Sequence, residues 1–316
     1  MSDKLQTANR ALVKEQRPDL KIEDEVALVN RMLCPKTGRF AAKDCIENQC
    51  SVCKDVRATL EEHYSPLLES DPVVTWLSWS RVRKEKKVSR EPLTRQGPFK
   101  DLLEELLTDL LTPAQNTTLA KHLFVAHWQY HQFKTLKDNL SPQQILMVMD
   151  FAENRKSRAQ DEVKSAFYDK EQITLHPIIV YYRRSEDSPV VRHALDFVSN
   201  DLTHDHHAVH AFTLKALKYL QEIRVLRGSR EVVIFSDGCA AQYKGKGTFA
   251  DLSQYPFKIQ RCYYGSEHGK GEADAETGTI SKSLDTAVLC RQTVIRNSVD
   301  LFSWAEQNLS KDDDQG

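Results

Sequence analysis

The stretch Gln144-Ile-Leu-Met-Val-Met-Asp150 is an apolar run that ends directly at a carboxylate, and Glu231-Val-Val-Ile-Phe-Ser-Asp237 repeats this pattern later in the chain. Short apolar runs with polar flanks are typical of buried strands. A carboxylate that directly follows such a strand lies at the rim of the sheet, where it can hold a cation. The two stretches therefore predict a buried sheet with two aspartates at its edge.

A third group of acidic residues lies further along, in His268-Gly-Lys-Gly-Glu-Ala-Asp-Ala-Glu276. It could supply a third carboxylate next to Asp150 and Asp237. Three converging carboxylates are what a two-Mg²⁺ phosphoryl-transfer site needs, because the metals stabilise both the attacking and the leaving oxygen. The pattern therefore predicts nucleic-acid chemistry. Taken singly, each aspartate could instead cap the turn that follows its strand.

From residue 141 onward the chain alternates strand and helix patterns, which is an α/β order with a mixed sheet. This is the order of a ribonuclease-H-like fold, with helices on the faces of the sheet. The predicted strands cover residues 145–149, 173–182, 190–199, 231–235 and 258–264, and the predicted helices cover residues 208–225 and 274–296.

The preceding part of the chain is predicted to be mainly helical. Leucines at helical spacing predict an amphipathic helix over residues 100–111, which Pro113 ends. Residues 73–79 alternate and are rich in β-formers, so they predict a strand in which Trp76 and Trp79 belong to the core rather than to a base-stacking surface. Further helices are predicted over residues 23–33, 54–70 and 114–137.

Four of the seven cysteines are close together in the sequence. The closing Cys50-x-x-Cys53 has the usual knuckle spacing of tetrahedral zinc, and a site of four thiolates leaves no open coordination position, which makes it structural. Small buried thiols are the alternative interpretation. The predicted zinc ligands are Cys34, Cys45, Cys50 and Cys53.

Basic residues are clustered between positions 81 and 95, at Arg81, Arg83, Lys84, Lys86, Lys87, Arg90 and Arg95. Such a run is either a solvated loop or a segment that follows a phosphate backbone, and both interpretations stay open here. The formal net charge of -1 argues against a uniformly basic nucleic-acid binder, but it says little about local patches.

The composition is that of a soluble protein, because 316 residues with 40% apolar content can bury a substantial core. No apolar stretch reaches the roughly 18 residues that a membrane span needs, and the first residues have no signal-peptide pattern. We therefore expect a nuclear or cytoplasmic protein that is not secreted and has no membrane partner. The expected divisions are a helical segment with the zinc module over residues 1–70, a strand, basic segment and helical linker over 71–140, a ribonuclease-H-like catalytic domain over 141–309, and a disordered acidic tail over 310–316.

Three segments together resemble a family of transposon-derived proteins of animal genomes: Met149-Asp-Phe-Ala-Glu-Asn154, Phe235-Ser-Asp-Gly-Cys-Ala-Ala-Gln-Tyr-Lys244 and Tyr264-Gly-Ser-Glu-His-Gly-Lys-Gly-Glu-Ala-Asp274. These proteins are similar to DDE-type transposases, which have a ribonuclease-H-like catalytic domain, and a cysteine cluster often precedes that domain. The resemblance covers residues 30–309.

The resemblance implies that Asp150 and Asp237 are the first two catalytic acids and that they hold Mg²⁺ or Mn²⁺. The family motif His-Gly-Lys-Gly-x-x-Asp makes Asp274 the preferred third acid. Glu272 is the second choice, because it lies thirty-five positions after Asp237, near the separation common in such enzymes. Glu276 is the third choice.

Other residues of these segments could contact the substrate. Gly238 allows close approach of the backbone to a phosphate, and Gln242 could form a hydrogen bond with DNA. Lys244 and Lys270 could pair with a phosphate as point charges. The alternatives are a simple turn glycine and solvated lysines. After Asp274 the chain lacks the more usual glycine-rich stretch of the family, which leaves the geometry of the third ligand open.

Two functions are therefore expected. The first is a DDE-type transposase or nuclease that cleaves DNA and transfers strands by two-metal phosphoryl transfer. The second is a domesticated or decayed, catalytically inactive protein that binds DNA or another protein through its zinc segment, since a fold can persist without its activity. The resemblance also implies DNA as the partner and a homo-oligomer as the working assembly.

Overall fold

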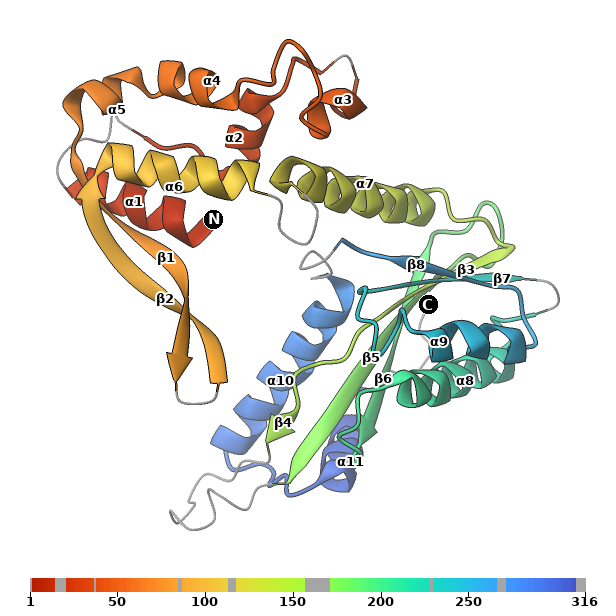
Figure 1. Cartoon of the computed structure of the whole chain (residues 1–316). Helices are drawn as coiled ribbons and strands as arrows, with labels where there is room; N and C mark the ends of the chain where they lie inside the picture. The colour runs from red at the N-terminus through yellow and green to blue at the C-terminus, as the bar shows by residue number, and fades with distance from the viewer. Residues whose placement is uncertain are drawn as a thin grey trace. The chain divides into compact units, whose positions relative to one another are not determined.

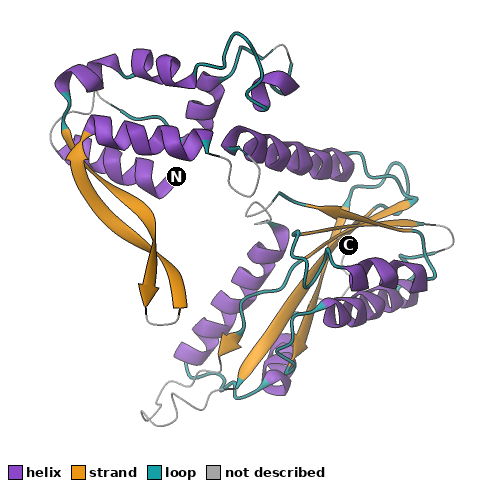
Figure 2. Ribbon diagram, in the orientation of Figure 1, coloured by secondary structure: helices purple, strands orange, loops and turns teal. Residues whose placement is uncertain are grey.

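The computed structural model describes residues 2–14, 21–36, 38–84, 87–112, 118–156, 171–227, 230–265 and 271–310. The chain divides into two compact units, Met1–Val125 and Ala126–Gly316. Each unit has buried apolar side chains of its own. Figure 1 gives the element labels, and Figure 2 shows that helices dominate the first unit whereas the large sheet belongs to the second.

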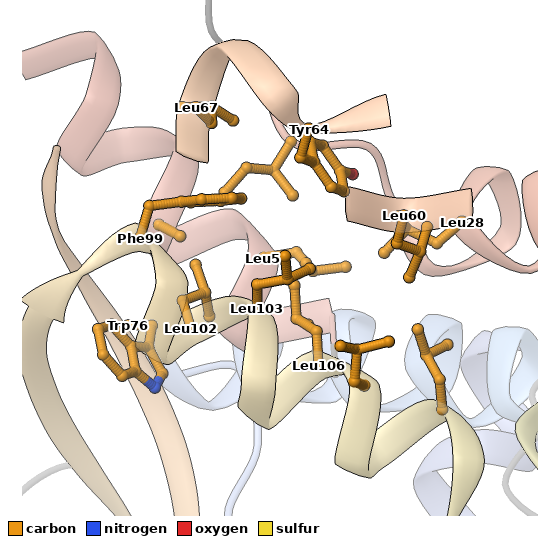
Figure 3. Close-up of a cluster of buried hydrophobic side chains, with 14 of the residues drawn as sticks. Leu5, Leu28, Leu60, Tyr64, Leu67, Trp76, Phe99, Leu102, Leu103 and Leu106 are labelled. Atoms are coloured by element: carbon orange, nitrogen blue, oxygen red, sulfur yellow. The ribbon is translucent and has the colours of Figure 1, made fainter. Parts of the chain in front are cut away.

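The first unit is built around a leucine-rich helix, α6 (Phe99–Leu111), whose buried residues recur at helical spacing along one face. They pack with α1 (Ser2–Lys14), and Figure 3 shows Leu102, Leu103 and Leu106 of α6 beside Leu5 of α1. The sequence prediction for residues 100–111 is thus confirmed. The remaining helices of this unit are α2 (Glu25–Met32), α3 (Lys43–Ile46), α4 (Val56–His63) and α5 (Ser65–Ser70).

The helix predicted over residues 54–70 is in fact two helices, α4 and α5, which meet at Tyr64. The cause is Pro66 in the first turn of α5, because proline has no N–H to continue the hydrogen-bond ladder of the preceding helix. The start of α4 is fixed by Asp55, whose carboxylate accepts a hydrogen bond from the backbone N–H of Ala58 at 3.0 Å.

Strands β1 (Val73–Lys84) and β2 (Lys87–Pro98) form a two-stranded antiparallel ribbon. The described residues of the basic segment therefore lie on regular strands, whereas Lys86 lies outside the described residues. Trp76 is buried, as expected, but Trp79 is 56% exposed, so its prediction as a core residue is wrong. Side chains alternate between the two faces of a strand, and α1 and α6 contact β1 on the Trp76 side.

The second unit contains a six-stranded mixed sheet. Its order is β6-β5-β3-β7-β8, with the short β4 pairing with the start of β5. β5 is antiparallel to β3 and β6, whereas β3, β7 and β8 are parallel. Three antiparallel strands followed by two parallel ones agree with the mixed α/β fold that the sequence predicts. The strands are β3 (Gln144–Met149), β4 (Arg155–Lys156), β5 (Gln172–Tyr182), β6 (Val191–Ser199), β7 (Glu231–Ser236) and β8 (Ile259–Tyr263).

Helices cover both faces of this sheet (Figure 1). Met147 on one face of β3 packs in a cluster with Leu217 of α8 (His206–Glu222). Val148 on the other face packs with Phe133 of α7 (Leu119–Asp138). The same face of β5 carries Leu175, which packs with α10 (Glu272–Leu289) and α11 (Ser298–Asn308). Two short helices, α9 (Lys246–Asp251) and a 3₁₀ turn (Leu252–Gln254), lead into β8.

The helix predicted over residues 274–296 is shorter in the structure. The prediction extends to residue 296, but α10 ends at Leu289, and α11 was not predicted. Arg291 has a φ of 57°, the left-handed conformation that ends helices. Asn297 then caps α11 by accepting a hydrogen bond from the backbone N–H of Asp300 at 2.9 Å. Within the described ranges, no helix is long and apolar enough to cross a membrane.

Candidate functional site

Asp150 and Asp237 lie side by side at the ends of two neighbouring parallel strands. The register of β3 and β7 aligns Val148 with Phe235, and each aspartate follows two residues later, directly after the last residue of its strand. Neighbouring strands are about 4.8 Å apart. Both aspartates line the same cavity, and the charge of Asp237 acts on the carboxyl group of Asp150. The structure thus brings these two predicted site residues together.

The carboxyl group of Asp150 is in an unfavourable environment for a charge. Burial raises the pKa of Asp150 to about 7, and the nearby charges of Asp237 and Asp274 add to this rise. Its Oδ1 accepts a hydrogen bond from the backbone N–H of Phe151 at 2.8 Å, which acts in the opposite direction. Asp237 accepts one from the backbone N–H of Cys239 at 3.0 Å. Three carboxylates therefore share one electrostatic environment, which either a proton or a cation at Asp150 would relieve.

The three acids at the start of α10 differ in their partners. Glu272 accepts a hydrogen bond from Nζ of Lys137 at 2.7 Å, and Glu276 lies 2.5 Å from a guanidinium nitrogen of Arg192. Burial raises the pKa of Glu272, but the hydrogen bonds from Lys137 and Tyr181 and the charges of Lys137 and Arg192 together outweigh burial, so the net pKa is lowered. Among the described residues, no ion pair involves Asp274, which is exposed and accepts a hydrogen bond from the backbone N–H of Gly271. Asp274 is thus the acid of this helix that is left to interact with a ligand.

A polar cavity of about 630 Å³ opens beside the two strand ends. Both aspartates line it, together with the segment that follows β3 and with polar side chains from other elements. A cavity with several converging oxygen and nitrogen atoms suits a polar or charged ligand better than an apolar one. The lining residues are Asp150, Phe151, Ala152, Glu153, Asn154, Lys156, Gln172, His204, Asp237 and Gln242.

One wall of this cavity contains residues that the sequence did not point to. The imidazole of His204 stacks on the ring of Phe151, with 4.2 Å between the ring centroids and 11° between the planes. His204 Nε2 is also 3.0 Å from the hydroxyl of Thr174. Behind Phe151, the buried Tyr243 makes a hydrogen-bond contact of 3.2 Å with Nε2 of His176. Phe151 and Tyr243 belong to the sequence motifs that resemble the transposase family, so these motifs indicated them. Nothing in the sequence indicated that His204 stacks on Phe151.

The predicted substrate residues fall into different positions. Gln242 lines the cavity. Gly238 is exposed, and a Cβ added there would meet nothing within 4 Å, so the packing around Gly238 leaves room for a side chain. Lys244 is exposed, with Nζ 5.1 Å from the centroid of the Tyr263 ring, and it does not line the cavity. Lys270 lies outside the described residues.

The four N-terminal cysteines converge in the first unit. Their sulfur atoms all lie within 4.8 Å of one another, and those of Cys34 and Cys50 are 3.7 Å apart. Cys45 comes from α3, and the other three come from the loops on either side of it. The backbone N–H groups of Cys53 and Val52 donate to the sulfur of Cys50 and lower its pKa to about 6. The chain thus forms a compact four-thiol cluster of the kind that its spacing predicts.

Comparisons with known proteins add the following. No curated protein sequence matches the chain. A chain of the simian T-cell lymphotropic virus intasome in complex with PP2A regulatory subunit B56 gamma is 13% identical, with a TM-score of 0.30 over 54% of this protein, which spans about half (50%) of that chain. The Mos1 transposase paired-end complex with left transposon end is 11% identical, with a TM-score of 0.36 over 98% of this protein and 81% of that chain. The Mos1 Strand Transfer Complex is 10% identical, with a TM-score of 0.33 over 96% of this protein and 78% of that chain.

A family match is more direct. The family described as Domain of unknown function (DUF8701) matches residues 129–313, which is more than half of the chain and includes both aspartates, the cavity and all of α10. The matched range contains every strand of the six-stranded sheet. The protein therefore belongs to the DUF8701 family.

Proposed function

We propose that this protein cleaves DNA and transfers DNA strands by metal-dependent phosphoryl transfer, with Asp150, Asp237 and Asp274 as the acids of the site. The observation that carries the proposal is the position of Asp150 and Asp237 directly after two paired parallel strands, in one cavity, with Asp237 and Asp274 contributing to the raised pKa of Asp150. Clustered carboxylates in a polar cavity are costly without a compensating charge. The metal ions of a phosphoryl-transfer site would supply that compensating charge.

The donor set suits a hard divalent cation. Carboxylate oxygens are the ligands that Mg²⁺ and Mn²⁺ prefer, and the cavity adds the amide groups of Asn154 and Gln242. Asp150, Asp237 and Asp274 would hold the ions. When bound, Mg²⁺ or Mn²⁺ supplies Lewis-acid stabilisation of charge on the phosphoryl oxygens and lowers the pKa of an attacking hydroxyl.

Other residues of the chain orient the acids and bind the substrate. Lys137 and Arg192 pair with Glu272 and Glu276, which fixes the first turn of α10 and so orients Asp274. Gln242 and Asn154 line the same cavity as the aspartates, where their amides can donate hydrogen bonds to a phosphate. In cleavage, a water oxygen forms a bond to phosphorus and the bond from phosphorus to the 3′ oxygen breaks. In strand transfer, a DNA 3′-hydroxyl takes the place of that water.

We further propose that Cys34, Cys45, Cys50 and Cys53 bind a structural zinc ion. Four sulfur atoms around tetrahedral zinc, each at about 2.3 Å from it, lie about 3.8 Å apart, close to the observed 3.7 Å between Cys34 and Cys50. Backbone N–H donation to a thiolate favours the charged form that zinc requires. With four thiolates the coordination is complete, so the role is to stabilise the surrounding fold.

The test of catalysis is nicking and strand transfer on labelled duplex DNA with Mg²⁺ or Mn²⁺, comparing the native chain with Asp237→Asn. We expect the variant to lose about 100-fold or more in rate, because residues that only support metal ligands already cost 10- to 100-fold. Asp187→Asn is the matched control, since Asp187 is an exposed carboxylate of the turn between β5 and β6 and lies away from the cavity lining.

The outcome that contradicts the enzymatic proposal is equal activity in the native chain and Asp237→Asn. Absence of cleavage in all three proteins, with DNA binding intact, would favour the second function, a catalytically inactive binding protein. Thermal melting of each variant shows whether a loss of activity is due to unfolding.

A further inference from the structure

One face of the β1–β2 ribbon is open and carries arginines and a tryptophan. On β1 this face contains the odd-numbered residues, among them Trp79, Arg81 and Arg83, all of which are exposed. Residues directly opposite in an antiparallel pair share a face, which adds Pro92 opposite Trp79 and Arg90 opposite Arg81. We call these five residues the ribbon face. Figure 1 shows this end of the ribbon extending beyond α1 and α6 of the same unit.

The ribbon face carries several positive charges close together. Arg81 and Arg90 occupy directly opposite positions, where like charges destabilise a sheet. Among the described residues, neither arginine nor Arg83 has an ion pair. The opposite face of the same ribbon differs, because Arg95 there is 2.8 Å from a carboxylate oxygen of Glu105. Within the described residues, Glu105 is therefore an acidic partner for the arginine that faces the protein, and the three that face away have no ion pair there.

Trp79 is the second feature of the ribbon face. Its side chain is 56% exposed, although a tryptophan in contact with water forgoes a large hydrophobic gain. It is two residues from Arg81 on the same face, so their Cα atoms are about 6.8 Å apart along the strand. An exposed aromatic ring next to several cations is the composition of surfaces that stack bases and neutralise phosphates.

We propose that the ribbon face binds an unpaired stretch of nucleic acid, with a phosphate between Arg81 and Arg90 and a base stacked on Trp79. An anionic polymer that alternates charge with planar rings matches both features at once. An acidic peptide would match the arginines and leave Trp79 without a partner, and a fully paired duplex hides the faces of its bases. The arginine pair then becomes favourable, because the bound phosphate lies close to both guanidinium groups.

The inference shares with the proposed function only the class of ligand, nucleic acid. It concerns the first unit, whereas the carboxylates belong to the second. Binding measured with zinc retained but without Mg²⁺ or Mn²⁺ therefore tests the ribbon face alone. If the ribbon variants bind DNA like the native chain but Asp237→Asn loses cleavage, the ribbon proposal is wrong and the catalytic proposal stands. If the ribbon variants lose binding but Asp237→Asn cleaves like the native chain, the catalytic proposal is wrong and the ribbon proposal stands.

The experiment is fluorescence anisotropy of the full chain with a labelled 20-nucleotide single strand and with the duplex of the same sequence. We expect the single strand to bind more tightly and to quench tryptophan fluorescence. The double substitution Arg81→Gln with Arg90→Gln should lower the slope of log affinity against log salt by about 0.7, since the two arginines share one phosphate and each phosphate contact contributes about 0.7 for single strands. Trp79→Ala should weaken binding by about tenfold or more, and Trp79→Phe should restore most of it.

The control removes the same charge elsewhere, through Arg10→Gln with Arg184→Gln, two exposed arginines on α1 and on the turn after β5. Thermal melting and zinc content confirm that each variant is folded. The proposal is overturned if the ribbon variant has the same salt slope as this control, or if Trp79→Ala binds single strands as well as the native chain. A preference for the duplex without tryptophan quenching also overturns it.

Discussion

Single residues at the end of β3 show how a charged site is built against a buried interior. Asp150 and Phe151 are adjacent, yet the carboxyl group is directed to the cavity while the ring packs on His204 and near the buried His176. His176 is fully buried, and burial lowers its pKa to about 3. It is therefore neutral in the folded protein at physiological pH, and its Nε2 contacts the hydroxyl of Tyr243. The aromatic layer behind the acids thus contains a titratable group that must stay uncharged.

The lowered pKa of His176 predicts that this residue lowers the stability of the protein in acid. An unfolded histidine has a pKa of about 6.5, so between that pH and pH 3 the unfolded chain binds a proton that the folded chain does not. The contribution of His176 to the free energy of unfolding should therefore fall as pH falls below 6.5, by up to about 1.4 kcal/mol per pH unit. His176→Gln should reduce the change between pH 7 and pH 5 by up to about 2 kcal/mol in urea denaturation.

The comparison of two chains isolates His176, because Asp150 and Asp196 have raised pKa values and act in the opposite direction in both chains. His207→Gln is the control, since His207 is exposed. Parallel stability profiles for the native chain and His176→Gln would show that this histidine is not kept neutral in the folded state.

At the scale of elements, the first turn of α10 determines which acid is available to a ligand. Three acids follow one another at every second position, so they point in different directions around the helix. Glu272 meets Lys137 of α7, Glu276 meets Arg192 of β6, and Asp274 meets neither. The sequence order alone ranks these acids only by motif and by spacing.

Asp274→Asn and Glu272→Gln should therefore differ in the cleavage assay. We expect Asp274→Asn to reduce the rate by about 100-fold or more, as a lost ligand would, and Glu272→Gln to reduce it by about tenfold or less, as a supporting residue would. The measurement is the single-turnover rate of each variant at saturating Mn²⁺. The opposite ranking would make Glu272 the third acid.

At the scale of the whole molecule, the chain consists of two units with separate cores, and they are stabilised in different ways. The second has a six-stranded sheet with helices on both faces. The first has a two-stranded ribbon, helices and the four-cysteine cluster. A metal held by the four cysteines would stabilise the segment that folds around them, because binding free energy adds to folding free energy.

Removal of zinc should therefore affect the first unit selectively. We expect Cys53→Ser, or a chelator, to lower the melting temperature of one calorimetric transition and to leave the transition of the second unit in place. Cys290→Ser is the control, because Cys290 is an exposed cysteine outside the cluster. Metal analysis of the purified native chain should give one zinc per molecule, and free thiols without zinc would contradict the assignment.

The sequence by itself determined the local features of this protein. Apolar runs that end in Asp150 and Asp237 predicted the strands β3 and β7, helical leucine spacing predicted α6, and cysteine spacing predicted the thiol cluster. Each depends on residues that are near one another in the chain, where periodicity and spacing leave a direct trace. The errors were local as well: Pro66 divides a predicted helix, and the left-handed Arg291 ends α10 early.

Only the tertiary structure decided which residues meet across long separations. Parallel pairing brings Asp150 beside Asp237, α7 and β6 supply the cations that engage two of the three acids of α10, and His204 arrives on Phe151 from the far end of the connection after β6. The exposed face of Trp79 likewise follows from β1 having one neighbouring strand and helices on one side. Such pairings depend on how the whole chain buries its apolar surface, and strand alternation alone does not specify which face is covered.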